Sequence, residues 1–161
     1  MLDEIPVDAA RYFFNAKPES QMDFDLDLAV RQDSDNPVYY VQYAHARICR
    51  LIETLAADGY KVKKAADINV SLLKDECEIA LIKHLGQFAE EIRLAARDYD
   101  PSRINRYLTE LASSFHKFYN NCTIRGAQDD ILYARLKLAD CTRMVLAAAM
   151  ALIGVSAPVI M

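Results

Sequence analysis

Apolar residues recur at a helical period along residues 104–118, and this repeat constrains the fold more than any other feature of the chain. Five of them occupy positions i, i+4, i+7, i+11 and i+14: Ile104, Leu108, Leu111, Phe115 and Phe118. That spacing predicts one apolar face on a long helix, which Asp100 and Pro101 begin as N-cap and first turn. Because a single amphipathic helix has no core of its own, the stripe must pack against other helices.

Three further segments have the same helical character. Residues 37–57 follow Asn36 and Pro37, which suit an N-cap and a first turn. Residues 71–99 predict a helix with a break near Gly86, and residues 127–153 predict the last helix. With 161 residues, 53% hydrophobic, and only 4 glycines and 5 prolines, the chain is one compact domain. We therefore predict an all-α fold, an antiparallel helical bundle.

The first 35 residues have a different pattern. Residues 6–16 predict a short helix, whereas residues 21–30 alternate apolar and acidic side chains, which predicts a short strand or extended arm. A single strand has no partner in this chain, so we expect it to pair with structure outside it. The sequence thus divides into an N-terminal segment, 1–35, and a helical domain, 36–161.

The charge is unevenly distributed along the chain. The net charge is −4, which argues against a generally basic nucleic-acid-binding protein. Residues 1–36 carry −6, whereas residues 37–161 carry +2. Any anion-binding surface must therefore be local to the helical domain.

The sequence offers no catalytic or metal-binding pattern. The four cysteines have no CxxC spacing and lie in apolar helical segments, as expected for free thiols in a reducing cytoplasm. No nucleophile–base pair, paired-carboxylate site or glycine-rich phosphate loop is present. We expect no catalysis, metal or cofactor in this chain alone, and no secretory signal in the residues after Met1.

Residues 144–161 contain 18 consecutive uncharged residues, which is the minimal length of a membrane span. Gly154 is a candidate helix C-cap and Pro158 follows it, so the helical part after Arg143 is only about ten residues long. A buried terminal helix with an apolar tail is therefore expected, and a membrane anchor is the minor alternative.

Two groups of side chains are candidates for binding. On a helical wheel of 37–57, four residues lie together opposite the core face: Tyr39, Tyr43, Arg47 and Arg50. Ring faces beside guanidinium groups are what single-stranded nucleic acid requires for base stacking and phosphate contact. Tyr and Arg are also enriched in protein interfaces, so a helical protein-interaction module is the alternative. A second group, in the segment 113–126, can face outward near a helix end: His116, Lys117, Tyr119, Asn120 and Arg125.

Four segments, in order, resemble the C-terminal region of bacterial arginyl-tRNA synthetases. "VDAARYFF" and "MDFDLDLA" resemble the segment that leaves the catalytic domain, and "NPVYYVQYAHARI" resembles the first helix of the anticodon-binding bundle. "LASSFHKFYNNC" resembles the middle of that bundle, and "ARLKLADCTRMVLAAAMALIGVSAP" its final helix, in the DALR domain. The chain departs from the family at its end, where "SAPVIM" replaces the usual "SAPERM".

The resemblance implies a bundle of the class I synthetase anticodon-binding type. It makes residues 1–35 the end of a catalytic domain and residues 36–161 a DALR domain. The HIGH-type and KMSK-type motifs are absent, so this fragment would be inactive alone. The parent enzyme would use ATP with magnesium to attach arginine to the tRNA 3′ end.

The implied partners are the anticodon loop of an arginine tRNA and the catalytic domain of the same polypeptide, with no membrane or DNA. We expect Tyr39 and Tyr43 to stack on bases and Arg47 and Arg50 to lie near phosphates. The remaining expected contacts are base-edge readers and an apolar prop at the chain end: Tyr119, Asn120 and Met161.

Overall fold

The structure, a computed structural model, describes residues 5–17 and 24–161. All regular secondary structure in these residues is helical. The chain has seven α-helices there: α1 (Val7–Ala16), α2 (Leu26–Val30), α3 (Pro37–Ala57), α4 (Glu76–Gly86), α5 (Phe88–Asp98), α6 (Ser102–Asn121) and α7 (Asp129–Leu152). Two short 3₁₀ turns, η1 (Ala65–Asp67) and η2 (Val70–Leu72), lie between α3 and α4. The predicted all-α class is confirmed.

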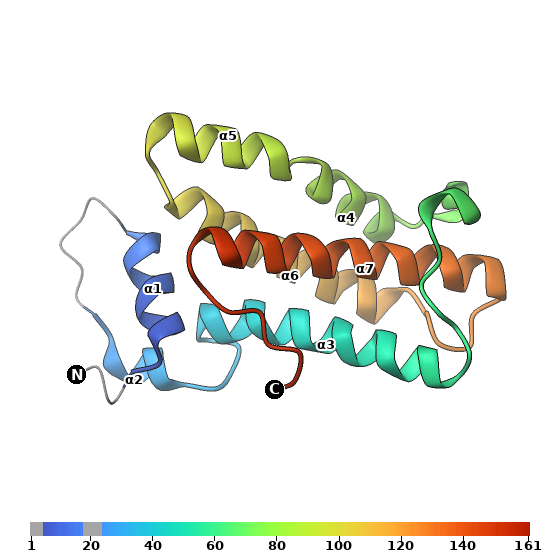
Figure 1. Cartoon of the computed structure of the whole chain (residues 1–161), viewed down its shortest axis with the longest axis horizontal. Coiled ribbons are helices and arrows are strands. Elements are labelled where there is room, and N and C mark those ends of the chain that lie inside the picture. Colours follow the sequence, from blue (N-terminus) through green and yellow to red (C-terminus); the bar gives the residue numbers. More distant parts are fainter. Residues whose placement is uncertain (1–4, 18–23) are drawn as a thin grey trace.

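The long helices form an antiparallel bundle (Figure 1). Helices α3 and α6 run in one direction, and α7 and the consecutive pair α4–α5 run in the other. Helices α1 and α2 lie at the end of the bundle where α3 begins. After α7 the chain turns back and crosses α3, so the C-terminal tail lies beside this helix. This crossing brings residues more than 100 positions apart into one surface.

Side-chain caps define where the helices begin. The side chain of Asn36 accepts a hydrogen bond from the Val38 N–H, and Pro37 occupies the first turn of α3, as predicted. At α4, Asp75 and Glu78 form a reciprocal capping box. The carboxylate of Asp100 accepts a hydrogen bond from the Ser102 N–H at α6. These caps satisfy backbone donors that a helix leaves unpaired.

The predicted apolar stripe forms the centre of the core. All five of its residues are at most 4% exposed: Ile104, Leu108, Leu111, Phe115 and Phe118. They pack with the buried face of α3, including Val41, Ile48 and Leu55, and with α7. Burial of these side chains removes a large apolar area from water, which is the main force that holds the bundle together.

The predicted strand over 21–30 is wrong where the structure describes it. Residues 26–30 form helix α2, because the Asp25 carboxylate caps this turn by accepting a hydrogen bond from the Leu28 N–H. Ala29 is buried, and no strand occurs among the described residues. Residues 21–23 of the predicted strand lie outside that part of the chain.

Two other predicted elements have shifted boundaries. The helix expected from residue 71 begins at Glu76, because the capping box at Asp75 starts it there, and its break falls at Gln87, next to Gly86. Helix α7 ends at Leu152, and Gly154 follows with a φ of +69°. Within the described residues, no helix combines the length and hydropathy needed to cross a bilayer.

Candidate nucleic-acid interface

The exposed side of α3, the end of α6 and the C-terminal tail enclose a groove of about 530 Å³. Its lining includes five of the seven residues that sequence analysis selected: Tyr43, Arg47, Arg50, Tyr119 and Met161. The other lining residues are Ala46, Leu51, Glu53, Thr54, Arg125, Val159 and Ile160. The bundle thus brings together side chains from three separate segments of the sequence.

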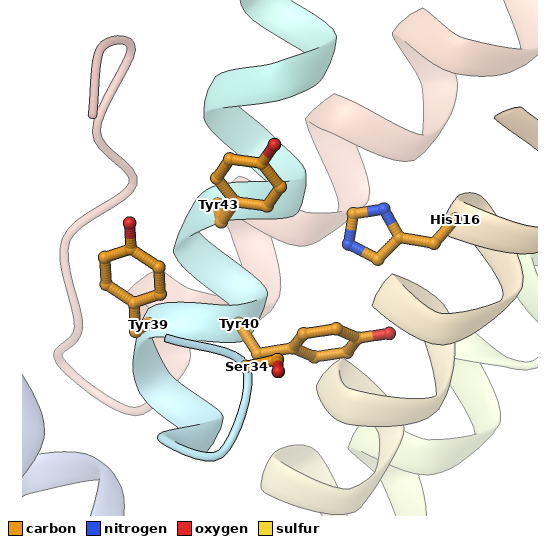
Figure 2. A pocket seen from close by; sticks show the side chains of 5 residues that line it. All are labelled: Ser34, Tyr39, Tyr40, Tyr43 and His116. Carbon is orange, nitrogen blue, oxygen red and sulfur yellow. The ribbon is translucent and has the colours of Figure 1, made fainter. Parts of the chain in front are cut away.

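A second hollow of about 410 Å³ adjoins the groove and is lined by Ser34, Tyr39, Tyr40, Tyr43 and His116 (Figure 2). Tyr43 lines both, so the two hollows are neighbours. The rings of Tyr39 and Tyr43 are nearly parallel, with an interplanar angle of 7° and centroids 6.3 Å apart. Residues four apart share one face of a helix, which explains this alignment. The pair offers two adjacent ring faces for flat ligands.

Arg47 is held in a fixed position within the groove. Its guanidinium carbon lies 4.1 Å from the centroid of the Tyr119 ring, a cation–π contact. Its Nη1 lies 3.3 Å from Nδ1 of His116. Because a guanidinium group only donates, Nδ1 accepts this bond and the imidazole carries its proton on Nε2. Burial and the Arg47 charge lower the pKa of His116 to about 4, which keeps the ring neutral.

The remaining arginines of the groove differ in their partners. Arg50 is exposed, and among the described residues no carboxylate pairs with either Arg50 or Arg47. Arg125 instead forms an ion pair with Asp58, with Nε 2.9 Å from Oδ2. The groove therefore combines two arginines without a carboxylate partner and one whose charge is balanced.

The structure places Asn120 and Tyr39 away from the main groove. Asn120 is exposed and lines neither hollow. Tyr39 lies in the smaller hollow, which it shares with Tyr43.

Sequence analysis assigned no role to Tyr40 or Ile160 and named His116 only within the second outward-facing group, although all three line the site. The position of His116 three residues before Tyr119 was a usable signal, since both lie on one helical face. Val159 and Ile160 mark the departure in the "SAPVIM" ending, and their side chains are 61% and 84% exposed.

The described residues contain no group of three or more His, Cys, Asp or Glu side chains arranged to hold a metal ion. All four cysteines are free thiols. The groove itself offers aromatic rings, guanidinium groups, hydroxyls, aliphatic side chains and the carboxylate of Glu53.

A family model described as the DALR anticodon binding domain matches residues 41–161. The chain belongs to this family. The match begins at residue 41, within α3, and runs to the end of the tail, so it includes both walls of the groove. This membership favours the nucleic-acid interpretation of the Tyr/Arg surface over the protein-interaction module.

Curated relatives of this DALR domain are named arginine–tRNA ligases. The protein of Ruminiclostridium cellulolyticum is 46% identical over 159 residues, which is 98% of this chain and 28% of the relative. The protein of Symbiobacterium thermophilum is 49% identical over the same shares. The chain thus spans less than a third of the length of these relatives.

Solved structures share the fold of this DALR domain over nearly its whole length. A putative arginyl-tRNA synthetase from Campylobacter jejuni superposes with a TM-score of 0.88 at 30% identity, over 99% of this chain and 34% of that one. The arginyl-tRNA synthetase of Thermus thermophilus gives a TM-score of 0.82 at 27% identity, over 96% of this chain and 26% of that one. The N-terminal helices, which the family model leaves out, are therefore part of the shared structure.

Proposed function

We propose that this DALR domain binds the anticodon loop of an arginine tRNA as one part of an arginine–tRNA ligase. The observation that carries the proposal is the groove itself. In a family defined by anticodon binding, it joins tyrosine ring faces and two arginines without carboxylate partners. The catalytic domain would lie elsewhere in the same polypeptide and would use ATP with magnesium to attach arginine to the tRNA 3′ end.

Each side chain of the groove has a proposed role that its surroundings support. Tyr39 and Tyr43 stack on bases, since their parallel rings lie beside an open hollow. Arg50 and Arg47 lie near phosphates, with Arg47 held in place by Tyr119 and His116. This fixed geometry lowers the entropy lost on binding.

Base identity must be read by hydrogen bonds to the base edges. Every arginine anticodon has cytosine at its centre, which offers one amino donor and ring acceptors. The hydroxyl of Tyr119 has no hydrogen-bond partner among the described residues and can both donate and accept. We assign base-edge contacts to Tyr119 and to Asn120, which is exposed but lines neither hollow, and an apolar contact to Met161.

The proposal is tested by binding of the chain to an arginine-tRNA anticodon stem-loop, measured by fluorescence anisotropy at two salt concentrations. A matched stem-loop has the central C changed to U. We expect tighter binding to the C form, with affinity that falls as salt rises because phosphate contacts release counterions. Equal binding to both RNAs would contradict base reading. No binding at low salt by a folded chain would contradict the proposal and favour the protein-interaction module.

A further inference from the structure

We propose that three side chains of α1, Asp8, Arg11 and Asn15, position the C-terminal tail and thereby set the affinity of the groove for RNA. The inference rests on the proposed function, because the tail forms one wall of the candidate RNA groove through Val159, Ile160 and Met161. None of the three α1 residues lines that groove or the adjoining hollow. Asp8 lines a third hollow with Tyr39 and Met161, where its negative charge would repel a phosphate. We therefore assign all three a positioning role.

Helix α1 holds the turn that connects α7 to the tail. Arg11 donates from Nη1 to the Gly154 carbonyl oxygen at 2.7 Å, and Asn15 donates from Nδ2 to the Ile153 carbonyl oxygen at 3.2 Å. The last carbonyls of a helix have no partner within it, so these two bonds fix the end of α7. The direction in which the tail leaves the bundle is set at this point.

Asp8 connects α1, α3 and the tail. Its Oδ2 accepts hydrogen bonds from the Ser156 hydroxyl and from Gln42 Nε2, the latter at 2.8 Å. Gln42 Nε2 also lies 3.0 Å from the Ser156 carbonyl oxygen. One carboxylate oxygen thus fixes Ser156 against the outer face of α3, three residues before the groove wall begins.

His45 of α3 holds the next part of the tail. Its Nδ1 donates to the Pro158 carbonyl oxygen at 2.8 Å, since a carbonyl only accepts. His45 is only 4% exposed, and burial lowers its pKa. Residues 156 and 158 are therefore both anchored, whereas Val159 and Ile160 are exposed on the wall. The anchors determine where these two side chains lie.

Helix α1 is itself fixed to the bundle, so it can serve as a rigid support. Tyr12 is 2% exposed, and its hydroxyl oxygen lies 2.8 Å from Oγ1 of Thr109 and 3.1 Å from the Asn105 carbonyl oxygen. Asn105 donates from Nδ2 back to the Tyr12 carbonyl oxygen at 2.9 Å. A displacement of α1 relative to α6 would therefore move the tail and the groove wall.

The direction in which RNA affinity changes in Asp8 variants distinguishes a positioning role from a purely electrostatic one. If Asp8 acted only through charge, both Asp8→Ala and Asp8→Asn would strengthen RNA binding, since a negative charge repels phosphates. If Asp8 positions the tail, Asp8→Ala must weaken binding because the acceptor is lost. Asp8→Asn keeps an acceptor oxygen and must preserve binding.

The experiment measures anticodon stem-loop binding by the full chain and its variants. We expect Asp8→Ala to lose about 5-fold in affinity, the effect of one or two hydrogen bonds, and Asp8→Asn to stay within about 2-fold of wild type. Ser156→Ala removes the hydrogen-bond donor on the tail and must reproduce the loss of RNA affinity seen in Asp8→Ala. It also provides the test if Asp8→Ala does not fold. Arg11→Ala must weaken binding more than Arg97→Ala, which removes an equal charge from α5.

Amide hydrogen exchange of residues 155–161 without RNA provides an independent readout. We expect faster exchange in Asp8→Ala and Ser156→Ala and unchanged exchange in Asp8→Asn. Unchanged exchange in all variants, or faster exchange with unchanged RNA affinity, would overturn the inference. Failure of the wild-type chain to bind any RNA would overturn the proposed function, and the exchange comparison alone would then decide whether α1 positions the tail.

Discussion

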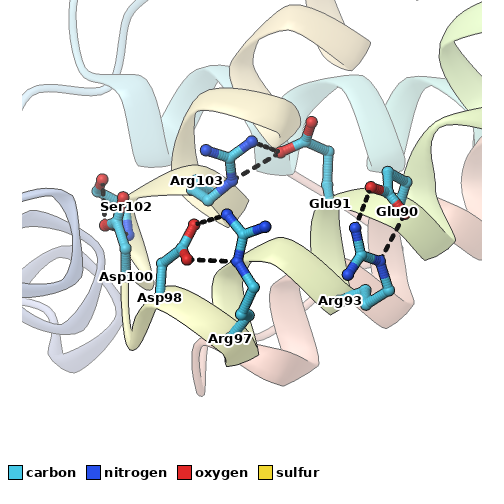
Figure 3. Close-up of polar contacts among 8 residues, drawn as sticks. All are labelled: Glu90, Glu91, Arg93, Arg97, Asp98, Asp100, Ser102 and Arg103. Atoms are coloured by element: carbon cyan, nitrogen blue, oxygen red, sulfur yellow. Dashed lines mark hydrogen bonds and ion pairs between the residues drawn. The ribbon is translucent and has the colours of Figure 1, made fainter.

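Helices α3 and α5 both carry arginines on their exposed faces, but the two helices differ in what surrounds those arginines. On α5, Arg93 bonds to Glu90 and Arg97 bonds to Asp98, with nitrogen–oxygen distances of 2.6–2.8 Å (Figure 3). On α3, Arg47 faces an aromatic ring and a neutral histidine, and Arg50 has no carboxylate partner among the described residues.

This difference between α3 and α5 shows that the number of arginines on a helix does not identify an RNA-binding surface. The α5 arginines are neutralised by their own neighbours in sequence, so little charge remains for a phosphate. The α3 arginines keep their charge and lie beside tyrosine rings, which gives both contacts that single-stranded RNA requires. Helix α5 has no buried residue, whereas α3 is buried along one whole face. The following predictions test this contrast.

The largest expected effect concerns packing. Ile48 on α3 is 0% exposed, and Ile92 is only partly buried on α5. We expect Ile48→Ala to lower the free energy of unfolding by about 3 kcal/mol, because it leaves a cavity in the core. Ile92→Ala should cost less than half as much. Urea denaturation followed by circular dichroism measures both, and equal losses would show that α5 is as essential to the core as α3.

The next effect concerns base stacking. Tyr43→Ala should weaken binding of the anticodon stem-loop by about 10-fold, since a base–aromatic stack contributes 1–3 kcal/mol. Tyr99 is the matched control, because it is 92% exposed at the end of α5 and outside both hollows. Tyr99→Ala should leave affinity unchanged. A similar loss in both variants would mean that the tyrosines of the groove have no special role.

A smaller effect separates the two sets of arginines. Arg50→Ala should weaken RNA binding and reduce the slope of log affinity against log salt by about 1, because one phosphate contact is lost. Arg97→Ala removes the same charge from an ion pair with Asp98 and should leave that slope unchanged. Anisotropy titrations at four salt concentrations provide both slopes. Equal slopes in the two variants would contradict the proposed phosphate contact.

The last effect concerns pH. The pKa of His116 falls from 6.5 to about 4 in the folded chain, so the unfolded chain binds more protons between these values. The contribution of His116 to stability therefore decreases as pH falls from 6.5 to 4, and His116→Gln should flatten this decline. On α5, bonds from the arginines lower the pKa of Glu90 and Asp98, so their contribution is lost only at lower pH. Thermal unfolding at pH 4.5, 5.5 and 7 compares the variants, and identical pH profiles would place His116 in solvent.

Much of the fold is predictable from local signals. Both signals are local: the apolar stripe of 104–118 and the Asn36–Pro37 cap each lie within a few helical turns. The helical period of apolar residues and the capping residues therefore suffice to locate α6 and α3 in the sequence. Helix α2 shows where such signals conflict. Its alternating pattern suggests a strand, yet Asp25 also caps a helical turn, and the local hydrogen bond decides the outcome.

The candidate site is only partly predictable. Tyr43, Arg47 and Arg50 share one helical face and can be selected from a single segment. Tyr119 is selected from a second segment, whereas Met161 rests on resemblance to a family. The neutral acceptor role of His116 requires the packing of α3 against α6. The course of the tail depends on bonds between residues 8 and 156, and no short-range pattern encodes that contact.

The most direct test of RNA binding between α3 and the tail is methyl NMR of the chain with ¹³C-labelled methionine, recorded during titration with the anticodon stem-loop. Met161 lines the groove and is 49% exposed, whereas Met144 is 55% exposed on α7 and Met150 is buried. We expect the Met161 methyl signal to shift and the Met144 and Met150 signals to stay unchanged. A shift of Met144 with no change at Met161 would place the RNA on another face and contradict the proposed groove.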